Sequence, residues 1–305
     1  MKYSALTWVK PTIDGSLKQT RQALEQFVEN PKDIAPLQQC VGWLREIRGT
    51  LNLLELQTAA LLIQSVEMVI AALLAGKVKN SEQLYDVLMR TLVQLPNYLD
   101  HLLIVKSDMP LAVLPLINAL RRVVKQAPLS AINVFTPDLS VTVPHARHVA
   151  LPDPKLKAFI KQLRGAYQKG LMTLIKQPKN PAGLKFIFTV MQRLQQVTGR
   201  APISSVLWVT EGIVEALLQK GLGLNKAILT SFKQIDALLK RIMDHGNAAL
   251  RLPPPKPVLT NLLYFAGHAR SKGPRITAIK KAFKLQGYFP SEATLQAARL
   301  AFSGP

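Results

Sequence analysis

The feature that most constrains the fold is a pattern of apolar residues at steps of three and four. Such steps place side chains on one face of an α-helix. The pattern recurs along the whole chain between breaks made of proline, glycine and asparagine. Over residues 153–176, for example, it comprises Leu156, Ile160, Leu163, Tyr167, Leu171 and Leu174. The sequence therefore predicts an all-α protein.

Capping residues, prolines and glycines set the expected helix boundaries. Between two sets of helices, residues 127–153 contain four prolines and no helical period, which favours an extended connector. We therefore expect a first bundle over 1–126, a connector over 127–153 and a second, basic bundle over 154–305. The expected helices lie near 16–28, 35–48, 53–75, 81–105, 110–126, 153–176, 182–198, 203–220, 225–245, 256–271, 275–284 and 291–302.

The second half of the chain repeats the first weakly but in order. "ENPKDIAPL" at 29–37 corresponds to "KQPKNPAGL" at 176–184, and "WLREIRG" at 43–49 corresponds to "RLQQVTG" at 193–199. "VEMVIAALLAG" then corresponds to "TEGIVEALLQKG" further along the chain. Three matches in the same order favour two duplicated antiparallel helical bundles. Chance similarity between leucine- and alanine-rich helices is the alternative.

One segment, "LREIRG", approaches the H-x-x-K-G pattern of a histidine phosphotransfer helix. Arg48 and Gly49 fit its last two positions, but Arg45 stands where the phosphate-accepting histidine belongs. A guanidinium stays protonated and cannot supply the nucleophilic nitrogen. Both copies are therefore interpreted as degenerate phosphotransfer sites without catalytic residues and as candidate docking positions. In the second copy these positions are Gln195, Thr198 and Gly199. In the first copy Arg45 and Arg48 lie one helical turn apart and are expected to present two cations to a partner; the alternative is that both belong to a solvated surface.

Several stretches resemble a known signalling family: "ALTWVK", "TRQALEQFVENP", "LREIRGTLNLLEL", "LTNLLYFAGHA" and "RITAIKKAFKL". They are similar to the N-terminal region of the chemotaxis-type histidine kinases ChpA and PilL and to their stand-alone relative FimL. The resemblance covers about residues 5–285. It implies degenerate phosphotransfer-like bundles that dock a CheY-like response regulator or a polar scaffold protein in the system controlling type IV pili and twitching motility.

Nothing in the sequence resembles the kinase's ATP-binding, receiver or coupling portions. The chain is therefore expected to be either a kinase fragment or a short adaptor. We predict a non-catalytic module that needs no cofactor.

The two halves differ in charge. Residues 1–126 carry 14 Lys and Arg against 11 Asp and Glu, whereas residues 127–305 carry 25 against 7. A basic half attracts acidic proteins, nucleic acid or anionic lipid. The alternative function is therefore a basic helical nucleic-acid-binding protein. The candidate basic patch consists of Lys157, Lys161, Arg164, Arg270, Lys272, Arg275, Lys280 and Lys281.

The sequence gives one argument against nucleic-acid binding by this patch and one against membrane-surface binding. Nucleic acid is disfavoured because no recognition signature accompanies the charge and no aromatic residues interleave the basic stretches. Membrane-surface binding through Lys157, Lys161 and Arg164 is disfavoured because the opposite helix face should be buried.

Cysteine and histidine usage excludes several other classes of site. Cys40 is the single cysteine, so the chain has no intrachain disulfide. His145 and His148 lack a nearby ligand set, and we predict no metal site.

The apolar segment 51–75 contains acidic and amide side chains, which favours a core helix over membrane insertion. The absence of a secretion signal in the N-terminal residues favours a cytoplasmic location.

Overall fold

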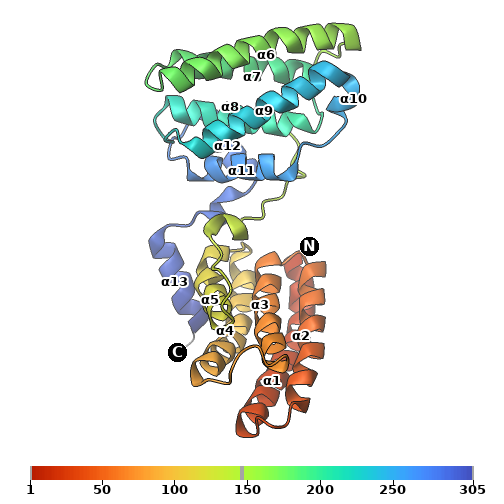
Figure 1. Cartoon of the computed structure of the whole chain (residues 1–305), viewed down its shortest axis with the longest axis vertical. Coiled ribbons are helices and arrows are strands. Elements are labelled where there is room, and N and C mark those ends of the chain that lie inside the picture. Colours follow the sequence, from red (N-terminus) through yellow and green to blue (C-terminus); the bar gives the residue numbers. More distant parts are fainter. Residues whose placement is uncertain (1, 145–147, 304–305) are drawn as a thin grey trace. The chain divides into compact units, whose positions relative to one another are not determined.

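A computed structural model of the chain describes residues 2–144 and 148–303, and within them the secondary structure is entirely helical (Figure 1). The all-α prediction is confirmed. Contacts divide the chain into two compact units. The first unit is formed by Met1–Thr136 together with Pro290–Pro305, and the second by Pro137–Phe289.

In the part of the first unit that the structure describes, six α-helices and one short 3₁₀ helix form an antiparallel bundle. Helix α2 packs between α1 and α3, α1 also packs on α4, and α3 packs on α5. Lys10 of α1 pairs with Asp100 of α4, and Arg21 donates to the carbonyl of Leu92, so these two helices run in opposite directions. The helices are α1 (Lys2–Glu29), α2 (Ala35–Leu53), α3 (Gln57–Leu74), α4 (Glu82–Val105), α5 (Pro110–Val123), η1 (Ala131–Val134) and α13 (Glu292–Ser303).

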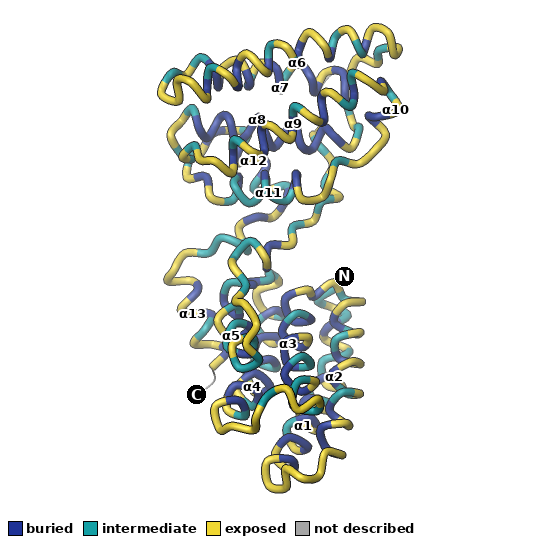
Figure 2. The backbone as a smooth tube through the Cα atoms, in the orientation of Figure 1, coloured by how far each residue is buried: buried dark blue, intermediate teal, exposed yellow. Residues whose placement is uncertain are grey.

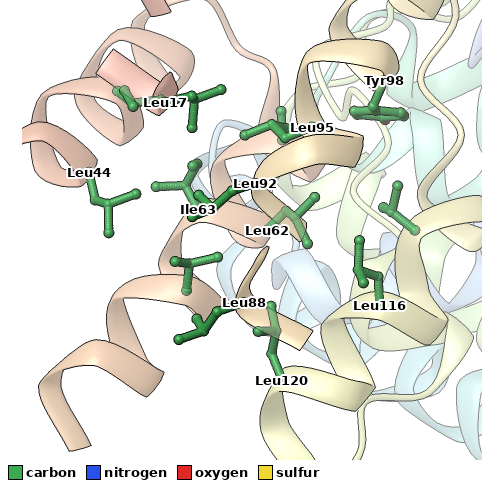
Figure 3. Close-up of a cluster of buried hydrophobic side chains, with 14 of the residues drawn as sticks. Leu17, Leu44, Leu62, Ile63, Leu88, Leu92, Leu95, Tyr98, Leu116 and Leu120 are labelled. Atoms are coloured by element: carbon green, nitrogen blue, oxygen red, sulfur yellow. The ribbon is translucent and has the colours of Figure 1, made fainter. Parts of the chain in front are cut away.

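The core of this unit is made mainly of leucine side chains. Leu17, Leu44, Leu62 and Leu92 come from four different helices and point toward one another (Figure 3). Each is fully buried, which is the main source of stabilisation in a bundle of amphipathic helices. Helix α3 is long and apolar enough to cross a membrane, but more than half of it is buried inside this unit, as expected for a core helix.

The second unit repeats the packing order of the first. Helix α7 packs between α6 and α8, α6 packs on α9, and α8 packs on α11. Helices α6, α7 and α8 therefore take the places of α1, α2 and α3, the helices that the sequence repeat pairs. Helices α9 and α11 take the places of α4 and α5, which the sequence repeat did not reach. The helices are α6 (Asp153–Lys176), α7 (Ala182–Thr198), α8 (Ile203–Leu218), α9 (Lys226–His245), α10 (Asn247–Leu250), α11 (Lys256–His268), α12 (Pro274–Ala282) and η2 (Leu285–Tyr288).

Helix α13 corrects the expected domain boundary. The second bundle was predicted to run to residue 305, but α13 packs on α4 and α5 of the first unit. Asn97 Nδ2 donates to the Phe302 carbonyl at 2.9 Å, and the Phe302 ring lies 5.1 Å from the Tyr98 ring. The boundary was missed because the apolar face of α13 indicates burial without indicating which bundle buries it.

Candidate functional site

The segment of the first repeat that was interpreted as a degenerate phosphotransfer motif lies on helix α2. The helix buries one side in the core through Leu37, Cys40, Leu44, Ile47 and Leu51. Gly42, Arg45 and Gly49 follow one another at steps of three and four residues, and each is exposed. Figure 2 shows exposed stretches along α2 as well as buried ones. Leu53, 87% exposed, continues the row one turn beyond Gly49. We call Gly42, Arg45, Gly49 and Leu53 the α2 face.

Nothing in the fold requires the two glycines of the α2 face. Both lie inside α2, outside the positive-φ region. A Cβ built on Gly42 or Gly49 would have no atom within 4 Å. Glycine in a helix interior costs roughly 0.5–1 kcal/mol relative to alanine. The packing of the bundle therefore does not explain the two glycines, and the same holds for Gly15 in α1 and Gly165 in α6.

The two arginines of the motif have different roles. Arg48 Nε lies 2.6 Å from Glu67 Oε2 on α3, so its charge is neutralised by a partly buried carboxylate of the neighbouring helix. Arg45 is exposed, and no described carboxylate pairs with it. The prediction that both arginines present a cation to a partner is corrected: Arg48 joins two helices, and Arg45 alone projects its charge outward.

Sequence reasoning missed the apolar end of this surface. Trp8, 85% exposed, lies near the start of α1, and Leu53 lies at the end of α2. The two helices pack against each other in opposite directions, so the start of α1 and the end of α2 lie at the same end of the helix pair (Figure 1). The sequence could have indicated the position of Leu53, because a step of four residues places it on the same helix face as Gly49.

The equivalent positions of the second repeat do not form a surface. Gln195 is buried and donates through Nε2 to Glu211 Oε2 at 2.5 Å, and Thr198 is also buried. Gly199 ends α7 with φ +52°, and a Cβ there would collide with the His148 ring. The docking role predicted for these three positions is not supported, because the bundle uses them for its own packing.

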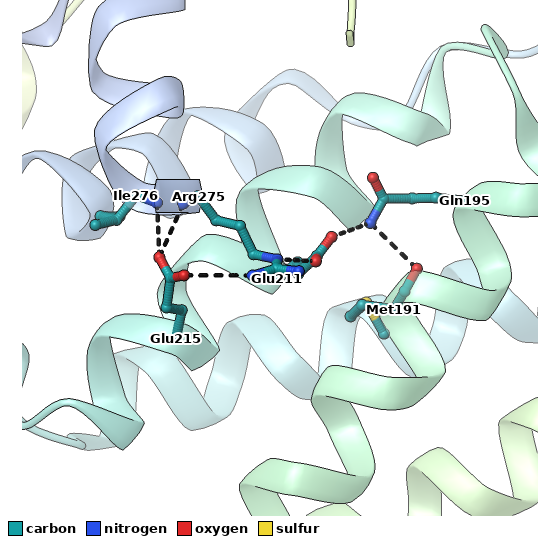
Figure 4. Close-up of polar contacts among 6 residues, drawn as sticks. All are labelled: Met191, Gln195, Glu211, Glu215, Arg275 and Ile276. Atoms are coloured by element: carbon teal, nitrogen blue, oxygen red, sulfur yellow. Dashed lines mark hydrogen bonds and ion pairs between the residues drawn. The ribbon is translucent and has the colours of Figure 1, made fainter. Parts of the chain in front are cut away.

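Glu211 belongs to a buried polar network between α8 and α12 (Figure 4). Arg275 Nε bonds Glu211 Oε1, and Arg275 Nη1 lies 3.5 Å from Glu215 Oε1. Glu215 Oε2 accepts the backbone N–H groups of Arg275 and Ile276, each at 3.0 Å. Burial lowers the pKa of Arg275, but bonding to Glu211 and the nearby carboxylate charges outweigh it and raise the pKa overall. Arg275 is therefore structural.

Two further members of the predicted basic patch are also used inside the bundle. Arg164 binds both carboxylate oxygens of Asp236, at 2.9 Å each. Lys280 donates to the Ala269 carbonyl, and burial lowers its pKa.

The other members of the patch lie on separate elements. Lys157 is half-buried on α6, where Lys161 is exposed. Among the patch members near α12, those that are exposed are Arg270, Lys272 and Lys281. Since α6 packs on α7 and α9 while α12 packs on α8 and α11, the eight residues do not form one patch.

A metal centre finds no support within residues 2–144 and 148–303, where no group of three His, Cys, Asp or Glu side chains could hold an ion. His145, one of the two connector histidines, lies outside the described residues. The Cys40 thiol is buried, its Sγ lies 3.7 Å from the Thr20 carbonyl, and burial raises its pKa to about 11. A buried thiol of high pKa is a packing residue, not a nucleophile.

Comparison with known proteins agrees with this two-bundle architecture. The family described as FimL C-terminal domain matches residues 4–114, and the family described as FimL scaffold protein second domain matches residues 152–296. The scaffold protein FimL of Pseudomonas aeruginosa strain PAO1 is 27% identical over 304 residues, which are 99% of this chain and 53% of that protein. The chain thus spans about half the length of this curated relative. Because the two family matches cover both bundles, the chain belongs to the FimL family.

Proposed function

We propose that this chain is a non-catalytic scaffold module that docks a CheY-like response regulator through the α2 face. The observation that carries the proposal is the pair of exposed glycines that the fold does not need, placed on either side of an unpaired arginine. The similarity to a protein named as a scaffold supports a role in binding proteins rather than in chemistry.

The chemistry of a receiver domain matches this surface. Receiver domains carry a cluster of carboxylates at the phosphorylation site, and an exposed guanidinium is a good partner for such a cluster. Glycines at 42 and 49 let a partner backbone lie close to α2. Because Arg45 replaces the histidine, the contact binds the regulator and does not accept its phosphoryl group.

The resemblance to ChpA, PilL and FimL supports the wider context. We propose that the module acts in a chemosensory system that controls type IV pili and twitching motility, in the cytoplasm. A polar pilus-scaffold protein is the second candidate partner for the same face.

Charge reversal on the α2 face tests the docking proposal. Titration calorimetry of the full chain with a receiver domain should show about tenfold weaker binding for Arg45→Glu, because a contact to a carboxylate cluster becomes repulsive. Lys18→Glu is the matched control, since Lys18 is an exposed cation on α1 of the same bundle and not on the α2 face. Equal affinities for the two variants would reject the α2 face.

Loss of phosphotransfer is tested separately. The chain is incubated with phosphorylated response regulator and examined for acid-labile label. We expect none, and label that disappears on mutation of a single histidine would contradict the proposal.

The alternative, nucleic-acid binding by the second bundle, is favoured by its charge alone. A gel shift with duplex and single-stranded DNA at increasing salt tests it, because phosphate contacts are lost steeply as salt rises.

A further inference from the structure

One part of the second bundle is unusual in its charge. Residues 154–210 contain ten Lys and Arg residues and no Asp or Glu. They cover α6 after its first residue, α7 and the first half of α8. Arg164 is bound by Asp236 of α9. The cations of this stretch that are exposed are Lys155, Lys161, Lys169, Lys176, Lys179, Lys185, Arg193 and Arg200.

Exposed apolar side chains lie among these cations near the turn that joins α6 and α7. Met172 is 52% exposed, Ile175 42% and Phe186 43%. Lys169 Nζ lies 5.6 Å from the Phe186 ring centroid, so α6 and α7 contribute to one surface. Met172 is three residues from Lys169 and four from Lys176, which places them on one helix face. We call Lys169, Met172, Ile175, Lys176, Lys179 and Phe186 the hairpin patch.

We propose that the hairpin patch adsorbs to anionic phospholipid surfaces. Its cations are lysines, which lie beside exposed apolar groups and have no carboxylate nearby in sequence. Amphipathic surfaces that bind membranes place lysines at the headgroups and apolar side chains at the edge of the acyl region. The proposal concerns adsorption by exposed side chains, and α3 stays in the core of the first unit.

Other macromolecules fit the hairpin patch less well. Protein interfaces are depleted in lysine, whereas every charged residue of the patch is a lysine. Proteins that bind single-stranded nucleic acid stack bases on open aromatic faces, but Lys169 already lies over the ring of Phe186. Anionic lipid is the partner that uses both the lysines and the apolar side chains.

Vesicle co-sedimentation of the full chain tests the electrostatic part. Binding is expected to vesicles of phosphatidylcholine that contain phosphatidylglycerol, to be absent from pure phosphatidylcholine, and to fall with salt. Each lysine near an anionic surface contributes roughly fivefold in affinity, so replacing Lys169, Lys176 and Lys179 by Gln should weaken partitioning about a hundredfold. The matched control replaces Lys226, Lys233 and Lys240, exposed on α9, by Gln and removes the same charge.

An equal loss of vesicle partitioning in the two triple Lys→Gln variants would show that binding depends on total charge and not on the hairpin patch, and would overturn the proposal. The apolar part is tested with Met172→Ser combined with Phe186→Ser, which should also weaken partitioning. Leu252→Ser, a substitution at another exposed apolar residue of the second unit, should leave it unchanged.

Circular dichroism establishes whether each variant folds. If the Met172→Ser, Phe186→Ser variant does not fold, the variant with Gln at 169, 176 and 179 decides whether the hairpin patch binds the vesicles. Failure to bind phosphatidylglycerol vesicles, together with binding to DNA or polyglutamate, would assign the cations to another partner.

Discussion

Replacement of the exposed glycines of α2 separates a role in docking from a role in folding. Gly42 and Gly49 lie in the helix interior, and a Cβ on either would have no atom within 4 Å. Alanine removes the entropic cost of glycine without a steric penalty, so each substitution should stabilise the first bundle by about 0.5–1 kcal/mol. The docking proposal accounts for this cost at two positions of one helix face, on either side of an exposed arginine.

The two substitutions should be additive. Seven residues separate them, a rise of roughly 10 Å along the helix, and they share no partner. The double variant Gly42→Ala, Gly49→Ala should therefore gain about 1–2 kcal/mol. For a unit of this size, each kcal/mol raises the melting temperature by roughly 2–4 °C. The expected increase is about 2–8 °C, within reach of differential scanning calorimetry.

Binding should change in the opposite direction. Gly49→Gln retains a good helix former but places a side chain where the partner backbone should approach, so it should weaken receiver binding while the bundle stays folded. Gly165→Ala is the control, because Gly165 lies inside α6 with equally open surroundings and away from α2. If Gly49→Ala lowers the melting temperature, the glycine serves the fold and the reasoning is refuted.

Three further predictions concern Arg275, Cys40 and His101. Arg275→Met should lower the free energy of unfolding in urea by about 2 kcal/mol, because it leaves the buried Glu211 without its cation; unchanged stability would argue against the network. The Cys40 thiol, with its pKa raised to about 11 by burial, should react with Ellman's reagent only as fast as the bundle opens, and rapid labelling of the native protein would contradict this. Burial lowers the pKa of His101 below 6.5, so protons favour the unfolded chain and the first bundle should lose stability as pH falls through about 6.5; His101→Gln should flatten that dependence in thermal melts.

Helix positions could be predicted closely from the sequence because each end carries a local signal. Ser81 caps α4 by accepting from the Leu84 N–H, Asn225 caps α9 by accepting from the Ile228 N–H, and Gly76 follows α3 with φ +65°. These contacts span only a few residues. The start of α1 was placed too late, at residue 16, although the helix begins at Lys2 and continues through Pro11. Tertiary packing of Leu6 and Ile13 overrides the proline there.

Contacts between residues far apart in the sequence could be predicted less well than the ends of the helices. The attachment of α13 to the first unit depends on Phe302 meeting Tyr98 and His101, which lie some two hundred residues earlier. The binding of Arg164 to Asp236 likewise joins α6 to α9. A sequence shows that such residues are charged or apolar, but their partners come from different helices. The expected basic patch was therefore overestimated, since Arg164 and Arg275 pair with carboxylates and Lys280 binds a backbone carbonyl.

The two repeats show why only one of them keeps an open motif. Both carry a glutamate near the middle of their third helix, Glu67 and Glu211, and a partly buried carboxylate needs a partner. In the first bundle Arg48 supplies that partner from the motif itself, which leaves Arg45 free to face outward. In the second bundle Thr198 stands at the position of Arg48 and carries no charge.

The second bundle satisfies its glutamate in another way. Gln195 turns inward to Glu211, and Arg275 arrives from α12, an added helix that packs on α8. A threonine at the position of Arg48 thus goes with burial of Gln195 and Thr198 and with an extra helix beside α8. If docking uses the α2 face, then of the two bundles only the first can provide it. The hairpin patch of the second bundle can then bind a different partner.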